Sequence, residues 1–102
     1  MALISKNTEL ITVAAVAVGF TADQYDETSA PGTILAKCVV EDAPIRINTA
    51  ATPTAGGAEG SPIKYPGEHF EVSGIRDLKS FLAIRTGSVS GKLNVIFLGS
   101  LV

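Results

Sequence analysis

The sequence predicts an all-β fold: a single-domain antiparallel β-sandwich or jelly-roll-like barrel of about seven short strands. Short apolar stretches with alternating or β-branched residues recur along the chain, and Gly, Pro, Ser and Asp separate them. No stretch has the apolar spacing of a long amphipathic helix. The 102 residues suit one domain and contain neither a linker nor a fixed repeat. We therefore treat residues 1–102 as one domain, with residues 1–8 as a candidate extended N-terminal arm.

The first apolar stretch is Leu10–Phe20, which is rich in β-branched side chains. This composition favours a strand that is covered on both faces. A buried helix is one alternative. Another is a secretory signal peptide cleaved after Ala22, although Glu9 and the single Lys6 fit that pattern poorly. The stretch is shorter than the ~20 apolar residues of a membrane helix, so we expect no membrane partner.

Thr21–Gly32 is a polar loop in which Asp23, Asp26 and Glu27 lie close together. Clustered carboxylates of this kind raise the question of calcium binding. Their spacing is not that of an EF-hand loop, and no Gly follows at the required position. A solvated loop is therefore the better interpretation.

The next strand is expected over Thr33–Glu41, where two kinds of position alternate. Cys38 falls on the more apolar face, with Ile34, Ala36 and Val40. A buried free cysteine behaves as a small hydrophobic residue, and we favour that role over a reactive thiol. Cys38 is the only cysteine, which excludes an intrachain disulfide framework and a Cys-rich zinc site.

A short strand follows over Ile45–Asn48. Alternation places Ile45 and Ile47 inward and Arg46 and Asn48 outward.

Thr49–Ser61 consists almost wholly of small residues and contains the pair Gly56-Gly57. It lacks the Gly-Lys-Ser/Thr ending of a phosphate-binding loop, and no helix pattern follows it. We expect an exposed, mobile loop.

The second half of the chain predicts four more strands and one helical turn. Pro66-Gly67 suits the central positions of a type II turn, because Pro fixes φ and Gly accepts positive φ. The last strand has apolar residues on both faces, so we expect it to be largely covered on both. The expected segments are a strand and turn over Pro62–Gly67, strands over His69–Val72, Phe81–Arg85 and Lys92–Leu98, a helical turn over Gly74–Ser80 and a hairpin loop over Thr86–Gly91.

The composition argues against several classes of function. A net charge of -2 gives no basic field for nucleic acid. The single histidine, His69, shares a strand face with Glu71, but a solvent-facing histidine is the plainer interpretation. No nucleophile-elbow, metalloprotease or Walker motif is present. The candidate carboxylate pairs belong to no motif either; they are Glu41 with Asp42, and Glu68 with Glu71. We expect a protein that is not an enzyme, with no catalytic, cofactor-binding or metal-binding residues.

The three arginines, Arg46, Arg76 and Arg85, are candidate interface residues. A strand arginine pairs with a carboxylate of its own domain or contacts a neighbouring subunit, and both alternatives stay open, with phosphate binding a weaker third. A charged fraction of only 18% also suggests that part of the surface is hidden in an assembly, because the usual fraction is about 25%.

Several short motifs lie between Glu41 and Phe97: Ala43-Pro44-Ile45-Arg46-Ile47, Ala51-Thr52-Pro53-Thr54-Ala55 with Gly56, Pro66-Gly67-Glu68, Gly74-Ile75-Arg76-Asp77-Leu78, Phe81-Leu82-Ala83-Ile84-Arg85-Thr86-Gly87 and Gly91-Lys92-Leu93-Asn94-Val95. Together they resemble a group of small virion proteins of tailed bacteriophages. The stretch before Pro53, Asn48-Thr49-Ala50-Ala51-Thr52, departs from the D-G-T-type turn of that pattern, so we expect this loop to differ in conformation.

The resemblance implies a β-sandwich that decorates or cements the capsid by binding the major capsid protein, and that carries no catalytic residues. It implies assembly in the host cytoplasm, a virion location and other copies of the chain as partners. It also argues against the signal peptide. A neck-, tail- or head-fibre-associated module that binds a receptor or glycan is the alternative, for which Tyr25 and Tyr65 are the plausible aromatic contacts. A secreted bacterial β-domain is a third hypothesis.

Overall fold

The computed structural model describes residues 3–25, 32–57 and 60–100, and this part of the chain forms one all-β domain. Seven strands and one short α-helix lie within it, as the sequence predicted. Neither the α-helix nor the single 3-10 turn of the described residues is long and apolar enough to cross a membrane. The elements are β1 (Leu3–Val13), the 3-10 turn η1 (Ala22–Gln24), β2 (Thr33–Glu41), β3 (Ile45–Asn48), β4 (Ile63–Lys64), β5 (His69–Ser73), α1 (Ile75–Ser80), β6 (Leu82–Arg85) and β7 (Gly91–Ser100).

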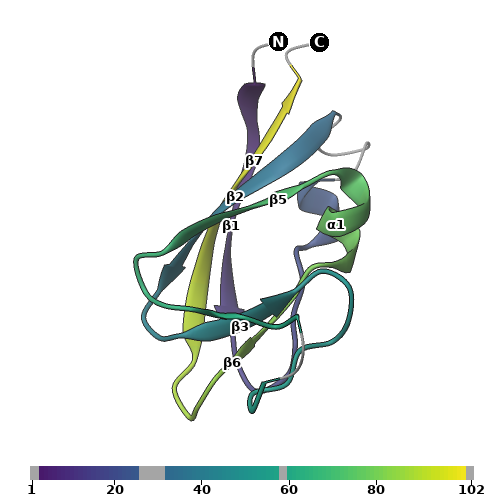
Figure 1. The fold of residues 1–102 in the computed structure, drawn as a ribbon. Helices are drawn as coiled ribbons and strands as arrows, with labels where there is room; N and C mark the ends of the chain where they lie inside the picture. Colours follow the sequence, from purple (N-terminus) through teal and green to yellow (C-terminus); the bar gives the residue numbers. More distant parts are fainter. Residues whose placement is uncertain (1–2, 26–31, 58–59, 101–102) are drawn as a thin grey trace.

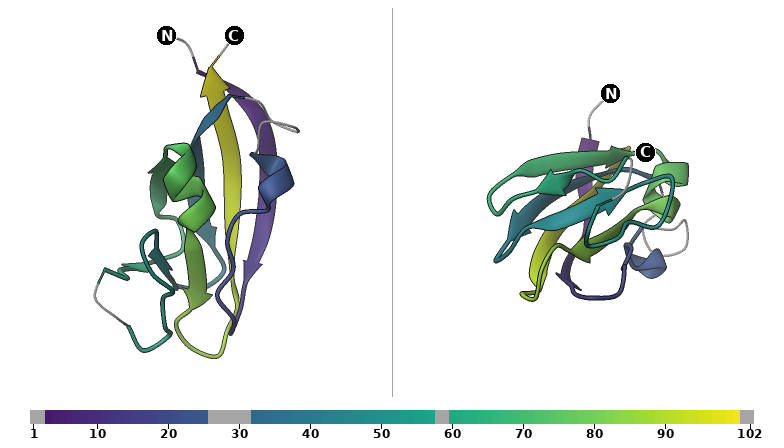
Figure 2. Two further views of the ribbon diagram at one scale, coloured as in Figure 1. Left: turned by 90° about the vertical axis from the view of Figure 1, so that its right-hand side faces the viewer. Right: turned by 60° about the horizontal axis from the view of Figure 1, so that its bottom comes forward.

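The strands form two antiparallel sheets that pack as a sandwich (Figures 1 and 2). The larger sheet has the order β1-β7-β2-β5, and the smaller has the order β4-β3-β6. The last strand, β7, therefore lies at the centre of the larger sheet, paired with β1 on one side and β2 on the other. The start of β1 and the end of β7 come together at one end of the molecule, because Leu3 is opposite Ser100.

The core lies between the sheets and follows from the alternation of strand side chains. On β7 the inward residues are Leu93, Val95 and Phe97, and all three are fully buried. Phe20 and Phe81 stack with ring centroids 4.3 Å apart, and Phe97 meets Phe20 edge-on at 5.4 Å. Each large apolar side chain buried here stabilises the fold by about 1.5–3 kcal/mol, so this aromatic cluster fastens one sheet to the other.

The expected continuous strand over Leu10–Phe20 is wrong. β1 begins earlier, at Leu3, so residues 3–8 of the candidate arm are its first part, and it ends at Val13. The chain then crosses to the smaller sheet, where Val18 and Ala83 exchange backbone hydrogen bonds of 2.9 and 2.8 Å. Leu10 is 58% exposed and Val16 80% exposed. Among the described residues only the inner face of the larger sheet is covered, so the outward Leu10 lies at the surface. Val16 is exposed in the segment that crosses to the smaller sheet.

The expected bounds of two strands are confirmed at Thr33–Glu41 and Ile45–Asn48. The turn at Pro66-Gly67 also forms: the Glu68 N–H donates to the Tyr65 carbonyl oxygen at 3.0 Å, and Gly67 has a φ of 92°. The expectation that the last strand is covered on both faces is wrong, because its outward Asn94 and Ile96 are exposed.

The expectations for Asn48 and for the small-residue loop need correction. Asn48 shares the outward face of β3 with Arg46, but it is buried there, and its Oδ1 accepts hydrogen bonds from the Ala50 and Ala51 N–H groups. The loop also has buried anchors at Pro53 and Ser61. They are buried because the loop folds back on the smaller sheet.

Of the acidic loop expected over residues 21–32, residues 26–31 lie outside the described residues, and with them Asp26 and Glu27. The described part begins with η1, in which Asp23 is exposed.

Candidate functional site

The outer face of the larger sheet is the candidate binding surface in the described part of the chain. The strand alternation that buries one side of β7 and β2 turns the other side outward, where no second layer of the residues that the structure describes covers it. Strand register brings side chains of four strands into rows across this surface: Ile96 is opposite Lys37 and Thr8, and Asn94 is opposite Val39 and Leu10. We call this surface the outer sheet face; its residues are Thr8, Leu10 and Thr12 of β1, Lys92, Asn94, Ile96 and Leu98 of β7, Leu35, Lys37, Val39 and Glu41 of β2, and His69, Glu71 and Ser73 of β5.

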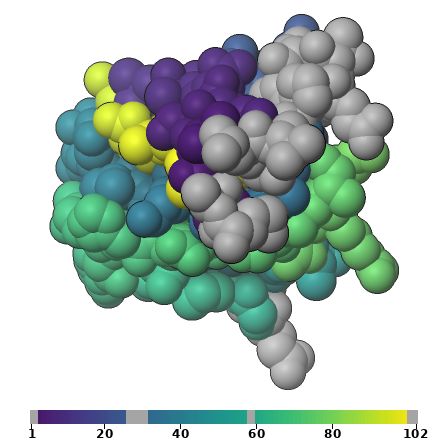
Figure 3. All heavy atoms as spheres, turned by 90° about the horizontal axis from the view of Figure 1, so that it is seen from above, coloured from purple at the N-terminus to yellow at the C-terminus, as the bar shows by residue number. Residues whose placement is uncertain are grey.

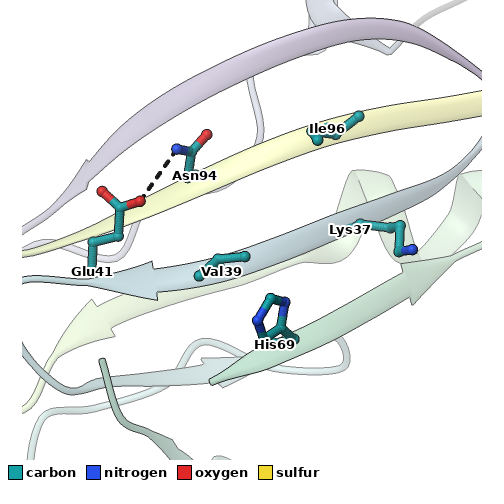
Figure 4. Close-up of a pocket in the computed structure, with 6 residues that line it drawn as sticks. All are labelled: Lys37, Val39, Glu41, His69, Asn94 and Ile96. Atoms are coloured by element: carbon teal, nitrogen blue, oxygen red, sulfur yellow. Dashed lines mark hydrogen bonds between the residues drawn. The ribbon is translucent and has the colours of Figure 1, made fainter. Parts of the chain in front are cut away.

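A shallow hollow of about 340 Å³ lies in the middle of the outer sheet face (Figure 4). Three strands form it, since its lining residues are Lys37, Val39, Glu41, His69, Asn94 and Ile96. The Asn94 amide donates from Nδ2 to Glu41 Oε2 at 3.3 Å, which fixes one rim of the hollow. Beside that rim, Lys92 Nζ is 3.7 Å from Asp42 Oδ2.

The hollow combines apolar and charged side chains. Its floor holds the apolar Val39 and Ile96, the latter 42% exposed, while Lys37 and Glu41 place both signs of charge around it. An apolar centre with a polar rim is the ordinary anatomy of a protein–protein contact. Within the described residues, no three His, Cys, Asp or Glu side chains are grouped closely enough to hold a metal ion.

The residues that the sequence suggested for acid–base chemistry are spread over this surface. His69 lies opposite Val39, and Glu71 lies opposite Lys37 on the neighbouring strand. The Glu68 carboxylate is engaged elsewhere, because its Oε1 accepts a hydrogen bond of 2.9 Å from the Tyr65 N–H in the turn.

The other carboxylate pair is also divided between different partners. Glu41 accepts from Asn94, whereas Asp42 faces Lys92. Asp42 has a φ of 72°, because the chain turns sharply there between β2 and β3.

The three candidate interface arginines do not form one cluster. Arg46 is half-buried on β3, Arg76 is exposed on α1, and Arg85 is half-buried at the end of β6. Arg46 is opposite Ile84, and Arg85 is opposite Ile45. The two strand arginines therefore lie on opposite faces of the smaller sheet.

Arg46 is held within its own domain. Its Nη1 donates to the Ser61 carbonyl oxygen at 2.9 Å, and its Nε donates to the Ala55 carbonyl oxygen at 3.2 Å. These bonds fasten the small-residue loop to β3. Arg76 leaves the greatest part of its side chain accessible among the three.

Cys38 and the two tyrosines have clear positions. The expected role of Cys38 as a small core residue is confirmed: it is buried, and burial raises the pKa of its thiol to about 12. Tyr25 is buried in the aromatic cluster, whereas Tyr65 is 54% exposed. Of the two candidate aromatic contacts for a glycan, only Tyr65 is therefore accessible.

The alternation in the sequence places Lys37, Val39 and Glu41 on one strand face, but it does not indicate that this face lies open. The signal was present, since the outward positions of β2 and β5 carry charged or polar side chains between the apolar ones. The missing information was which strands lie next to one another, because Glu41 and Asn94 are 53 residues apart in sequence.

Comparison of the chain with known proteins found no matching family model, no matching curated protein and no matching solved structure. The class that the structure defines is therefore an all-β, sandwich-like single domain with an open sheet face. The likeness to bacteriophage virion proteins stays a prediction from the sequence.

Proposed function

We infer that the chain is a non-enzymatic structural protein of a tailed-bacteriophage particle, which decorates or cements the capsid by binding the major capsid protein. The outer sheet face is the observation that supports this most strongly. It is a broad surface with half-exposed apolar residues at its centre and charges of both signs around them. The resemblance of the short motifs between residues 41 and 97 to those of virion proteins supplies the expected type of partner. The protein acts in the virion, in several copies.

A surface of this kind suits repeated, individually weak contacts. Ile96 and Leu10 are isolated exposed apolar residues on the outer sheet face. A single contact between this face and the capsid therefore buries only a modest apolar area. On a symmetric shell the same contact recurs many times, and binding at one position raises the effective concentration at the next. The shell is thereby strengthened without a single tight interface.

The test is to add the purified protein to particles that lack it and to locate it in a cryo-electron microscopy map. We expect ordered density on the capsid, with the outer sheet face against the major capsid protein. Ile96→Lys should abolish that density, because a charge would be buried at the centre of the contact. The matched control is Val89→Lys, at an exposed position in the loop before β7.

Two outcomes contradict the proposal. Absence of the protein from heads, necks and tails removes the virion role. Equal binding by the two lysine variants removes the outer sheet face as the contact surface.

The alternative, a receptor- or glycan-binding module of the neck, tail or head fibres, depends on exposed aromatic groups. Tyr65 is the one tyrosine that offers a half-exposed ring among the described residues. A glycan array separates the two functions, since loss of any glycan signal on Tyr65→Ala favours the module and a blank array favours the structural role.

A further inference from the structure

The edge of β1 is the longest unpaired strand edge among the described residues. β1 runs for 11 residues and pairs with β7 along one side only. In the space-filling view its purple atoms lie at the surface beside the yellow β7 (Figure 3). The edge strand at the other side of the same sheet, β5, has five residues, and the edge strand β4 has two. A strand edge of this length presents a row of N–H and C=O groups that can pair with another strand.

The usual protection of such an edge is weak here. Edge strands are commonly blunted by proline, by a bulge or by charged side chains. β1 has no proline, and its irregularity lies between Ser5 and Asn7, which leaves Asn7–Val13 as a regular stretch. The one charge in that stretch, Glu9, is held inside its own molecule by the N–H and hydroxyl of Thr21.

The segment after β1 does not cover the edge either. The Arg85 N–H donates to the Ala14 carbonyl oxygen at 3.1 Å, and Val18 pairs with Ala83. The segment after β1 thus joins the smaller sheet beside β6. The backbone groups of Ala14 and Val18 form hydrogen bonds with β6 and not with the edge of β1.

The regular stretch is nearly symmetric about its own centre. Its outward side chains are Thr8, Leu10 and Thr12, with Leu10 in the middle. If two copies of the stretch lie antiparallel about a two-fold axis through Leu10, each Thr8 is opposite Thr12 of the other copy, and Leu10 is opposite itself. Threonine pairs and aliphatic pairs across strands are favourable, and no like charges become opposed. The overlap spans residues 7–13, the whole regular stretch and nothing beyond it.

We propose that two copies of this chain pair antiparallel through the Asn7–Val13 edge of β1, with Leu10 on the two-fold axis. The two larger sheets become one continuous eight-stranded sheet, and the two Leu10 side chains lie side by side on its outer face. Isologous pairing of this kind is the usual way in which a soluble chain forms a closed dimer. This pairing needs only the chain itself and does not rest on binding to a capsid.

Site-specific cysteine cross-linking tests the register. Residues directly opposite each other in antiparallel strands have Cα atoms about 4.5–5.5 Å apart, within the range for a disulfide. Under mild oxidation, Leu10→Cys should form covalent dimers readily. Thr12→Cys alone should form few covalent dimers, because position 12 of one copy is not opposite position 12 of the other. A mixture of Thr8→Cys and Thr12→Cys chains should form covalent heterodimers, because these two positions face each other. Cys38 is buried and contributes no background.

Charge-swapped variants test the same pairing without cross-linking. Thr8→Lys/Thr12→Lys and Thr8→Glu/Thr12→Glu chains should each sediment as monomers, because like charges face one another. An equimolar mixture should sediment as a dimer. The matched control is Thr52→Lys/Thr54→Lys, which changes the net charge equally at exposed loop positions and should remain dimeric.

Circular dichroism and the unfolding midpoint of each variant verify that it is folded. The proposal is overturned if the unmodified chain sediments as a monomer at its highest soluble concentration. It is also overturned if Leu10→Cys cross-links no faster than Thr12→Cys, which would place any dimer contact elsewhere. Both experiments contain no capsid, so their outcome is independent of the proposed virion function.

Discussion

Arg46 and Ser61 lie 15 residues apart in sequence, and the Arg46 guanidinium donates a hydrogen bond of 2.9 Å to the Ser61 carbonyl oxygen. The same guanidinium donates from Nε to the carbonyl oxygen of Ala55. Arginine is suited to this task because its planar fork reaches two acceptors at once. An arginine that the sequence offered as an interface residue therefore anchors a loop of its own domain.

Replacing Arg46 should loosen that loop. We expect Arg46→Met to lower the free energy of unfolding by about 1–2 kcal/mol, since the Ser61 carbonyl oxygen loses a charged donor. Arg76→Met is the matched control, because Arg76 is exposed on α1, and it should change stability by less than about 0.5 kcal/mol. Urea denaturation of the two variants measures the difference. Equal destabilisation by both substitutions would show that the Arg46 bonds contribute nothing.

Gly57 and Gly56 offer a sharper comparison within the same loop. Gly57 has a φ of 95°, and a Cβ added there would lie 2.9 Å from Arg46 Cζ. At Gly56 an added Cβ meets nothing within 4 Å. We expect Gly57→Ala to destabilise the fold by about 1–2 kcal/mol through strain, and Gly56→Ala to be neutral or slightly stabilising. Thermal unfolding of the pair gives the sign of each change, and the reverse order would contradict this conformation of the loop.

The sequence predicted the strands whose bounds depend on local alternation of apolar side chains. It did not predict where the chain passes from one sheet to the other. β2 and β3 have the bounds expected from their residues, because alternate apolar side chains specify a strand locally. The stretch Leu10–Phe20 divides after Val13 because a separate sheet lies across the core, a fact that no local pattern contains.

The candidate site shows the same division. The outward positions of β2 and β5 were readable from the sequence, but the hollow arises only because β7, the last strand, inserts between β1 and β2. The role of Asn48 was not evident from the sequence either. Alternation places it on the outward face of its strand, and only the structure shows that it caps the following turn. Strand pairings and contacts between segments distant in sequence therefore determine the candidate site, and local sequence patterns do not contain them.

The buried thiol of Cys38 predicts both slow chemistry and a pH effect. Burial raises its pKa from 9.0 to about 12, so the reactive thiolate is scarce in the folded protein. A disulfide reagent such as dithiobis(nitrobenzoate) at pH 8 should label the native chain slowly and the urea-unfolded chain at once. Rapid labelling of the native chain would contradict the burial of Cys38.

The same shift sets the direction of a stability change with pH. Between pH 9 and 12 the unfolded chain releases the Cys38 proton and the folded chain keeps it, so the unfolded state is favoured as pH rises. The contribution is fully present below pH 9 and declines above it. Cys38→Ala lacks this group, so its stability should fall less between pH 8 and 10.5 than that of the unmodified chain. Parallel pH dependences in urea denaturation would contradict the raised pKa.

Asn48 provides the last test, because its buried amide serves three partners. Its Oδ1 accepts hydrogen bonds from Ala50 N–H at 2.7 Å and Ala51 N–H at 3.0 Å, and its Nδ2 donates to Ser61 Oγ at 2.9 Å. Asn48→Ala leaves these groups without their partner and should cost about 1–3 kcal/mol. Asn48→Asp keeps the two accepted bonds but loses the donated one, so we expect a smaller loss near neutral pH. Denaturation of both variants at pH 7 checks the order. A cost for Asn48→Ala below that of Asn48→Asp would contradict this order, because it would show that burial of the carboxylate and loss of the donated bond cost more than loss of the two accepted turn bonds.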